Sequence, residues 1–405
     1  MSQHLHDLIA AFARLGATDD GGVCRLTGTL EDKAARDLFA AEISSRGLDL
    51  AIDGIGNMFA TAMLNPASQA AVLVGSHLDS QPTGGRYDGV YGVLAGLCAA
   101  EALVARAAAQ PGAARRNLVV VNWTNEEGAR FQPSLTGSSV YAGVQSLQGA
   151  LALVDGEGET LGDALGAIGY RGADTLALTP LRYVELHIEQ GDRLEASSTD
   201  IGIVAGAWAA RKISVVFEGQ ASHTGPMPMP RRRDALRAAA RCIEILYDEV
   251  EQGAHASAAR ISVDPNSPNV VPSRVQVWFE IRHDDESITA LIADRFLRRI
   301  DGAVAPLGVT ARIAIDERRG TATLDPEGVK LAQGAAFDLG FTSVVMKTVA
   351  GHDALALQKR VPATLIFVPS RDGLSHNPGE FTEPAALDKG LAVLTETLWR
   401  MLTAP

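Results

Sequence analysis

Two patterns of apolar positions run along the chain, and each predicts a kind of element. Continuous apolar runs at 70–76, 117–123 and 363–369 predict buried strands. Apolar residues at helical spacing predict helices at 5–16, 31–47, 90–105 and 384–402. Buried strands separated by helices are typical of a parallel sheet covered on both faces. We therefore predict an α/β fold with a mostly parallel sheet and helices on both faces.

The middle of the chain has a different pattern. Strands are predicted at 211–219, 259–264, 273–283 and 309–316, and helices at 233–250 and 286–304. The order β-α-β-β-α-β is that of the ferredoxin-like unit. We therefore predict a small α+β domain at 209–322, inserted into a larger domain made of 1–208 and 323–405.

Composition narrows the classes of partner. With 36 Lys and Arg against 48 Asp and Glu, the formal charge is −12, which argues against non-specific binding of nucleic acid or of anionic membranes. We find no apolar run of roughly 18 residues and no signal peptide. Cys24, Cys98 and Cys242 are far apart, which fits a reducing compartment, the cytoplasm. We interpret the basic run Arg231–Arg233 as a solvated or interface feature.

Candidate chemistry follows the first buried strand. In an open α/β sheet, ligands bind beyond the carboxyl ends of the strands. His77 and Asp79 lie there, two residues apart, so they share a face in extended backbone. A carboxylate in that position can accept the second ring proton of a metal-bound histidine. Asp88 follows a glycine-rich turn at the start of a helix. The alternative is a turn that is simply rich in polar residues.

Further candidates follow the other strands. Glu126 and Glu127 come after the strand at 117–123, and adjacent carboxylates repel unless a cation or a shared proton compensates. His187 lies inside an apolar β-like run, where a histidine is usually a core residue, and His376 follows the strand at 363–369. Together these side chains match a two-metal site with nitrogen and oxygen ligands.

Six segments link these residues to a known family: GSHLDSQPTGGRYDG, NEEGARF, ELHIEQG, GQASHTGPMPMPRRRDA, NVVPSRV and GLSHNPGE. In this order they resemble the metal-dependent N-carbamoyl-L-amino-acid hydrolases, together with β-ureidopropionase-type β-alanine synthases and allantoate amidohydrolases. All belong to the aminoacylase/carboxypeptidase clan. The histidine of HIEQG, His187, is typical of the carbamoyl and ureido branch, since the peptidase branch has a carboxylate near there. The resemblance implies a zinc-exopeptidase-like fold with an inserted lid and dimerisation domain.

The resemblance also implies a pair of divalent metal ions. His77, Asp88 and His187 would hold one ion, and Asp88, Glu127 and His376 the other, so that Asp88 bridges them. The ions would lie roughly 3.5–4 Å apart with a shared water. Zinc is the default metal for such ligands, and manganese, cobalt or nickel would also suit.

The catalytic roles implied by the resemblance fall on three residues. Glu126 would be the general base that later passes its proton to the leaving nitrogen. Asp79 would orient His77. His223 would stabilise the oxyanion of the tetrahedral intermediate. In this clan that histidine typically reaches the active site of the partner subunit, which implies a homodimer.

Substrate binding is assigned by resemblance as well: Arg282, Asn269 and Arg211 to the α-carboxylate, and Gln190 with the backbone of Gly351 to the ureido side. Arg282 lies on the face of its predicted strand opposite the apolar residues, and a guanidinium suits bidentate binding of a carboxylate. His352 and Asp353 lie near the site by motif, and their role stays open.

The expected reaction is hydrolysis of an N-carbamoyl-L-amino acid to the amino acid, carbon dioxide and ammonia. Three alternatives remain: an allantoate amidohydrolase, an aminoacylase or dipeptidase, and a non-catalytic dimeric binding protein of the same fold. Allantoate also carries a carboxylate and ureido groups, so the predicted ligands do not discriminate. The segment GGRYDGVYGVLAG favours the carbamoylases. The expected partners are a small ureido substrate with a carboxylate and a second subunit, without nucleic acid or membrane.

Overall fold

The computed structural model describes residues 2–251 and 253–404. The chain forms two compact units, of which unit 1 is Met1–Ala205 with Leu324–Pro405 and unit 2 is Gly206–Thr323. The predicted insertion, 209–322, lies within unit 2. Each unit has its own hydrophobic core.

The main sheet runs in the order β1-β2-β4-β3-β5-β15-β6-β13, and β14 also pairs with β6. Its strands are β1 (Asp49–Ile52), β2 (Met58–Ala62), β3 (Ala70–His77), β4 (Asn117–Trp123), β5 (Thr179–Ile188), β6 (Ile201–Ala207), β13 (Ala322–Thr323), β14 (Ser343–Thr348) and β15 (Ala363–Val368). The central strands β4, β3, β5 and β15 are parallel to one another. Antiparallel strands flank this centre at both ends. The predicted parallel sheet is confirmed in its centre, and the antiparallel flanks add to it.

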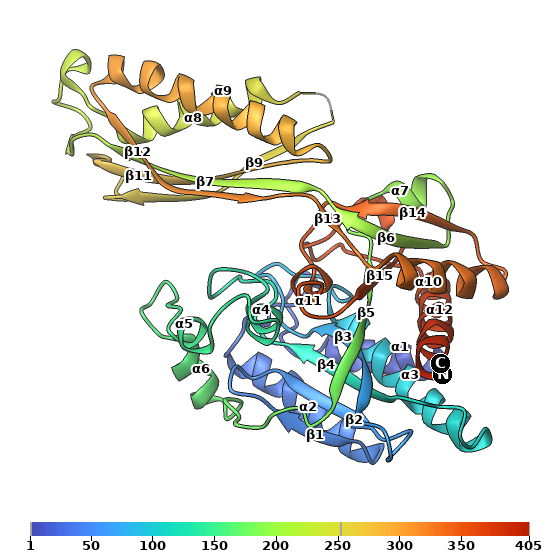
Figure 1. The fold of residues 1–405 in the computed structure, drawn as a ribbon. Helices are drawn as coiled ribbons and strands as arrows, with labels where there is room; N and C mark the ends of the chain where they lie inside the picture. The colour runs from blue at the N-terminus through green and yellow to red at the C-terminus, as the bar shows by residue number, and fades with distance from the viewer. Residues whose placement is uncertain (1, 252, 405) are drawn as a thin grey trace. The chain divides into compact units, whose positions relative to one another are not determined.

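Helices cover this sheet (Figure 1). They are α1 (Ser2–Phe12), α2 (Leu30–Ser45), α3 (Val90–Ala109), α4 (Thr136–Tyr141), α5 (Leu147–Leu151), α6 (Leu161–Ala167), α7 (Arg193–Ala196), α10 (Pro326–Asp338), α11 (Asp353–Leu357) and α12 (Pro384–Thr403), with a 3₁₀ turn η3 (Arg371–Gly373). Along β5, Val184, Leu186 and Ile188 belong to the core under α3 and α12. The alternate residue Glu185 accepts a hydrogen bond from the start of α11. Helices therefore lie on both faces, because successive strand residues point to opposite sides.

Helix α3 carries the most apolar segment. Among the described helices, it alone is long and apolar enough to span a membrane by length and composition. Glu101 and Arg106 interrupt its apolar residues, so it is not an uninterrupted apolar run of about 18 residues. Its residues from Val90 to Ala100 are buried, and it packs on β3 and α12. Burial around most of its circumference is the property of a core helix.

Unit 2 contains the β-α-β-β-α-β order. Its elements are β7 (Ala209–Glu218), β8 (Ser222–His223), η1 (Met229–Arg231), α8 (Ala235–Glu249), β9 (His255–Asp264), β10 (Val270–Val271), β11 (Arg274–His283), α9 (Glu286–Val304), η2 (Ala305–Leu307) and β12 (Thr310–Arg319). Its four-stranded sheet, built from described residues, has the order β12-β7-β11-β9, and every neighbouring pair is antiparallel. Ile213, Val215 and Phe217, alternate residues of β7, share a hydrophobic core with residues of α8 and α9. Both helices lie on the same face of this sheet (Figure 1).

Candidate metal centre and active site

The predicted metal ligands meet at one edge of the parallel sheet. His77 is the last residue of β3, and His187 is the last but one of β5. Glu127 follows the end of β4, and His376 follows β15. Because these four strands are neighbours and parallel, the segments that leave their carboxyl ends lie together. Asp88 joins them from the turn before α3.

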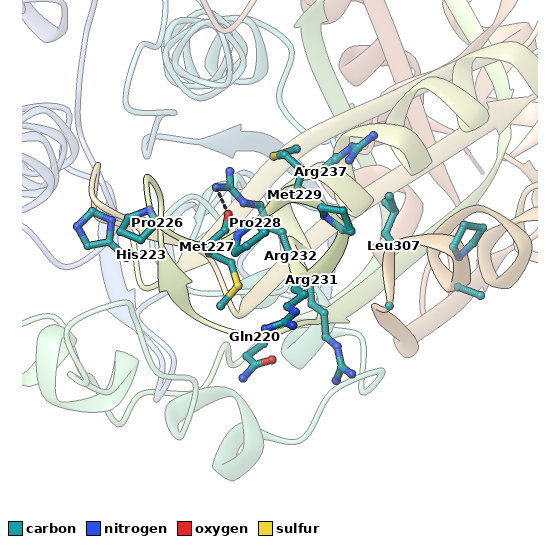
Figure 2. A pocket seen from close by; sticks show the side chains of 15 residues that line it. Gln220, His223, Pro226, Met227, Pro228, Met229, Arg231, Arg232, Arg237 and Leu307 are labelled. Atoms are coloured by element: carbon teal, nitrogen blue, oxygen red, sulfur yellow. Dashed lines mark hydrogen bonds between the residues drawn. The ribbon is translucent and has the colours of Figure 1, made fainter.

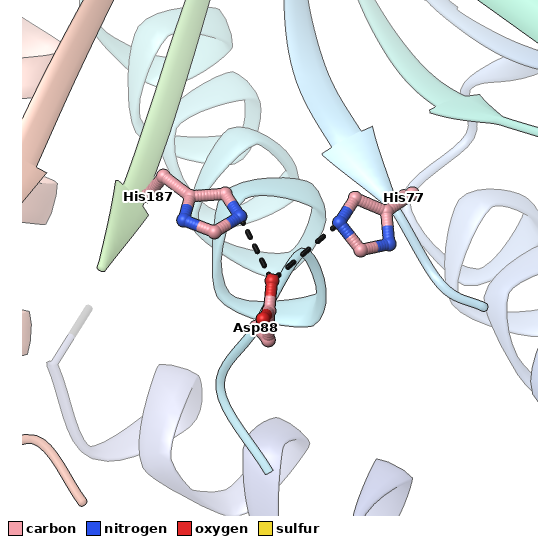
Figure 3. Close-up of side chains that lie close together, drawn as sticks. All are labelled: His77, Asp88 and His187. Atoms are coloured by element: carbon pink, nitrogen blue, oxygen red, sulfur yellow. Dashed lines mark ion pairs between the residues drawn. The ribbon is translucent and has the colours of Figure 1, made fainter. Parts of the chain in front are cut away.

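The first group of donors is His77, Asp88 and His187 (Figure 3). Nε2 of His187 lies 3.1 Å from Oδ1 of Asp88, and Nε2 of His77 lies 3.7 Å from the same oxygen. All three side chains are buried. Their donor atoms lie within 4.8 Å of one another, which is a spacing that one cation can bridge.

The second group uses the other oxygen of Asp88. Nε2 of His376 lies 3.2 Å from Oδ2 of Asp88 and 3.3 Å from Oε2 of Glu127. The His376 side chain is 45% exposed, whereas those of Asp88 and Glu127 are almost fully buried. Asp88 therefore faces both groups, and the second group is open toward solvent on the His376 side.

Burial and like charge dominate the electrostatics of the carboxylates. Burial and the neighbouring Asp88 raise the pKa of Glu127 to about 8. Burial, followed by the charges of Asp353 and Glu127, raises the pKa of Glu126 well above its usual range. Divalent cations would relieve this repulsion, because they favour the ionised carboxylate.

The central aspartate behaves differently. Burial alone would raise the pKa of Asp88, but hydrogen bonds from His187 and His376 outweigh it and hold that pKa well below its usual value. Burial likewise opposes protonation of the two imidazoles, but hydrogen bonds to Asp88 raise the pKa of His187 and His376 to about 9. These imidazoles and carboxylates form two three-donor nitrogen and oxygen sets, which suit divalent cations such as zinc.

Glu126 lies beside the ligands without belonging to either group. Its Oε2 is 3.5 Å from Nε2 of His77, and the residue is 7% exposed. A buried carboxyl in this position can exchange a proton with a reactant that lies between the two donor groups.

Asp79 contacts His77 mainly through its main chain. Nδ1 of His77 lies 2.9 Å from the carbonyl oxygen of Asp79, but 3.7 Å from its carboxylate. The carboxylate instead accepts the backbone N–H groups of Glu126 and Glu127, both at 3.2 Å, and the hydroxyl of Thr27 at 3.2 Å. Asp79 therefore contacts the ring of His77 through its carbonyl oxygen, and its carboxylate binds the backbone of the two glutamates; that Asp79 orients His77 stays a prediction.

Gly89 makes the turn before α3 possible. Its φ is +67°, and a Cβ there would lie 2.3 Å from Cε1 of His77. Only glycine combines that backbone conformation with so close an approach. The sequence therefore allows Asp88 to lie next to the ring of His77.

The residues assigned to the ureido side of the substrate lie beside the two donor groups. The side-chain amide of Gln190 donates to Oδ2 of Asp88 at 2.8 Å and to the hydroxyl of Ser375 at 3.1 Å. Gly351 is half-buried and precedes His352, whose ring centroid lies 4.6 Å from that of His187. Asp353 follows as the first residue of α11 and is fully buried.

Sequence reasoning missed Glu185. Its carboxylate accepts the hydroxyl of Ser76 and the N–H of Ala354, both at 2.8 Å. With His187 and His352 it forms a further buried group of possible metal donors. The available signal was a charged residue two positions before His187, on the same face of an apolar strand.

Unit 2 brings His223 and Asn269 close together. Strands β8 and β10 pair with His223 opposite Val270, and the N–H of Thr224 donates to the carbonyl of Asn269 at 3.3 Å. His223 is exposed and lines a pocket of about 910 Å³ within unit 2 (Figure 2). Arg282 lies on β11, 3.0 Å from Oε1 of Glu280.

Arg211 is occupied within unit 2. Its guanidinium forms a bidentate pair with Asp316 at 2.8 and 2.9 Å and contacts Asp294 at 2.9 Å. The residue is 3% exposed. This corrects the expectation that Arg211 binds the substrate carboxylate, because breaking such a bidentate pair would be costly.

The basic run lines the same pocket as His223. Arg232 turns back onto the carbonyls of Thr224 and Met227. The side chains of Arg231, Arg232 and Arg237 point in different directions (Figure 2), and Arg231 and Arg237 are exposed. This arrangement fits solvated arginines better than one convergent binding site.

Comparison with known proteins identifies the family. The sequence pattern of Peptidase family M20/M25/M40 matches residues 73–400. A putative hydrolase of Mycolicibacterium smegmatis is 41% identical, and the alignment covers 98% of this chain and 92% of the relative. An N-carbamoyl-L-amino-acid amidohydrolase of Rhizobium meliloti is 37% identical, with coverage of 94% and 91%. An allantoate amidohydrolase of Bacillus subtilis is 35% identical, with coverage of 98% and 96%.

Solved structures agree with these relatives. A hydantoinase/carbamoylase family amidase of Burkholderia vietnamiensis matches with a TM-score of 0.95 and 36% identity, over 100% of this chain and 98% of the other. A crystal structure of AtUAH in complex with (S)-hydroxyglycine matches with a TM-score of 0.91 and 28% identity, over 100% and 98%. The chain therefore belongs to Peptidase family M20/M25/M40, in its group of N-carbamoyl-L-amino-acid and allantoate amidohydrolases.

Proposed function

We propose that the protein hydrolyses the carbamoyl C–N bond of an N-carbamoyl-L-amino acid, giving the amino acid, carbon dioxide and ammonia. One observation carries the proposal: two groups of three donors share Asp88, and a buried glutamate, Glu126, lies beside them. A relative that is 37% identical is an N-carbamoyl-L-amino-acid amidohydrolase, which supports a ureido substrate for this site.

We assign the donor groups to two divalent cations. His77, Asp88 and His187 would hold one, and Asp88, Glu127 and His376 the other. When bound, such ions polarise a carbonyl group and lower the pKa of water. Zinc fits the nitrogen and oxygen donors, and manganese, cobalt or nickel are alternatives. Elemental analysis of the purified protein would show which metal it holds.

Glu126 performs the proton transfers in this proposal. Its burial and acidic neighbours raise its pKa, so that a proton taken from water can be held and then delivered to the leaving nitrogen. Asp79 supports this step, because its carboxylate accepts the backbone N–H of Glu126.

Unit 2 supplies the substrate-binding residues in this proposal. Arg282 and Asn269 bind the substrate carboxylate, and His223 stabilises the oxyanion in the partner subunit of a homodimer. Exposure of His223 and its place beside Asn269 support the assignment. Gln190 and the backbone of Gly351 contact the ureido group. Unit 2 then acts as the lid and dimerisation domain.

The free cysteines Cys24, Cys98 and Cys242 fit action in the reducing cytoplasm.

Allantoate is the second candidate substrate, because a relative of similar identity is an allantoate amidohydrolase. The deciding experiment measures ammonia release from a panel of N-carbamoyl-L-amino acids and allantoate, and release of the free amino acid from N-acetyl amino acids, with added divalent metal. We expect the highest kcat/KM on a carbamoyl amino acid. Preference for allantoate would select the second candidate, and cleavage of N-acetyl substrates alone would overturn the ureido assignment.

A further inference from the structure

Glu380 joins the two loops that carry Asp88 and His376. It lies four residues after His376 and is 3% exposed. Its Oε1 accepts the backbone N–H groups of Tyr87 at 2.9 Å and of Asp88 at 3.1 Å. A single carboxylate oxygen thus satisfies two consecutive amides, one of which belongs to the residue shared by both donor groups.

The surrounding backbone is shaped to admit this side chain. A Cβ on Gly85 would lie 2.1 Å from Cδ of Glu380 and 2.2 Å from its Oε1. The loop of Glu380 is also closed on itself, because its N–H donates to the carbonyl of Asn377 at 3.0 Å. The carboxylate therefore occupies a defined place between the loops.

Further contacts connect the same loops. The hydroxyl of Ser375 donates to Oδ2 of Asp88 at 3.0 Å, and that of Thr83 to the carbonyl of His376 at 3.3 Å. The rings of Tyr87 and Phe381 meet edge to face at 6.2 Å. None of these three contacts involves the backbone of Asp88, whereas Glu380 accepts the Asp88 N–H.

We propose that Glu380 is a positioning residue that fixes Asp88 relative to His376 and thereby completes the second donor group. The inference rests on the proposed function, since it concerns the affinity of the metal centre. Hydrogen-bonding partners of metal ligands typically contribute 10- to 100-fold to metal affinity or activity. Loss of the Glu380 contact is therefore expected to weaken the second metal by that factor and to weaken the first metal less, because the first keeps two histidines from β3 and β5.

Three substitutions separate the contact from other effects. Glu380→Ala removes the acceptor. Glu380→Gln keeps Oε1 as acceptor and places its amide nitrogen at Oε2, which has no hydrogen-bond partner among the described residues. Gly85→Ala leaves Glu380 intact but displaces its carboxylate. Glu383→Ala is the matched control, because Glu383 is exposed and its carboxylate pairs with Arg371 at the surface.

The test loads each protein with Co²⁺ and follows visible absorption and metal content during chelator titration, with far-ultraviolet circular dichroism as the folding control. We expect two ions per chain in the wild type. Glu380→Ala and Gly85→Ala should release one ion at about 10- to 100-fold lower chelator concentration, whereas Glu380→Gln and Glu383→Ala stay within about three-fold. Folded Glu380→Ala with wild-type affinity for both ions would overturn the proposal, as would equal losses in Glu380→Gln and Glu380→Ala. A wild type without a second ion would instead refute the proposed metal centre.

Discussion

The carboxylate of Asp79 accepts the backbone N–H of Glu126 at 3.2 Å, and its second oxygen accepts that of Glu127 at the same distance. The loop after β3 thereby sets the position of the glutamate pair after β4. One of those glutamates is the proposed proton carrier, and the other is a proposed metal ligand. We therefore expect Asp79 to affect both functions through the backbone of the two glutamates.

Substitution of Asp79 should therefore impair turnover. Asp79→Asn retains one acceptor for the two amides, and Asp79→Ala retains none. We expect kcat to fall with the first and to fall by about 10- to 100-fold with the second. Steady-state kinetics test this, with Thr27→Val as the control, because it removes only the hydroxyl that donates to Asp79. Wild-type kcat in Asp79→Ala would refute this role.

Glu126→Gln should separate chemistry from metal binding. The substitution removes the proton acceptor and leaves both donor groups intact, so turnover should fall by about 100- to 10,000-fold while metal content stays at two ions. Glu127→Gln is the comparison variant, because it removes a proposed metal ligand and should lower metal content as well as turnover. If Glu126→Gln retained full turnover, another residue would have to carry the proton.

His187→Ala should remove the metal of the first group. The ring is buried and lies 3.1 Å from Asp88, so its loss leaves two donors for that ion. Metal analysis after dialysis should show a loss relative to the wild type. His255→Ala is the matched control, since His255 is exposed and packs against Trp208. Equal metal content in both variants would contradict the assignment.

Stability without metal should fall as the pH rises above neutrality. Burial and Asp88 raise the pKa of Glu127 from 4.5 to about 8, so folded Glu127 holds a proton that the unfolded chain has lost. Against the effect of burial, hydrogen bonds to Asp88 raise the pKa of His187 and His376 from 6.5 to about 9. The histidine contribution is complete below pH 6.5 and is lost as the pH approaches 9. All three groups therefore favour the folded state less as the pH rises between 6.5 and 8.

Urea unfolding in the presence of EDTA at pH 6.5, 7.5 and 8.5 checks this expectation. The midpoint should decrease along the series, and added zinc should restore most stability at pH 8.5, where the ligands have lost their protons. A metal-free protein that becomes more stable toward pH 8.5 would contradict the electrostatic account.

The sequence predicted the centre of the fold because its strands are continuous apolar runs. The run at 117–123 has the same limits as β4, and the polar residues after such strands are the proposed ligands. Among the antiparallel flanks, β1 escaped prediction because its exposed and half-buried residues lack that signal.

Long-range pairings also lay beyond the sequence pattern. Arg211 contacts Asp294 and Asp316, on two later elements of unit 2. The carboxylate of Asp79 turns to the glutamate amides instead of His77, which depends on the path of the backbone after β3. Residue types and spacing indicate which groups can react, but tertiary contacts decide which partners they have.

Metal titration of ammonia release from one reactive N-carbamoyl-L-amino acid tests the central claim most directly. The metal-free protein should release no ammonia, and the rate should rise until two ions are bound per chain and then level off. Full activity in the metal-free protein would contradict the account. So would a rate of ammonia release that levels off at one bound ion per chain.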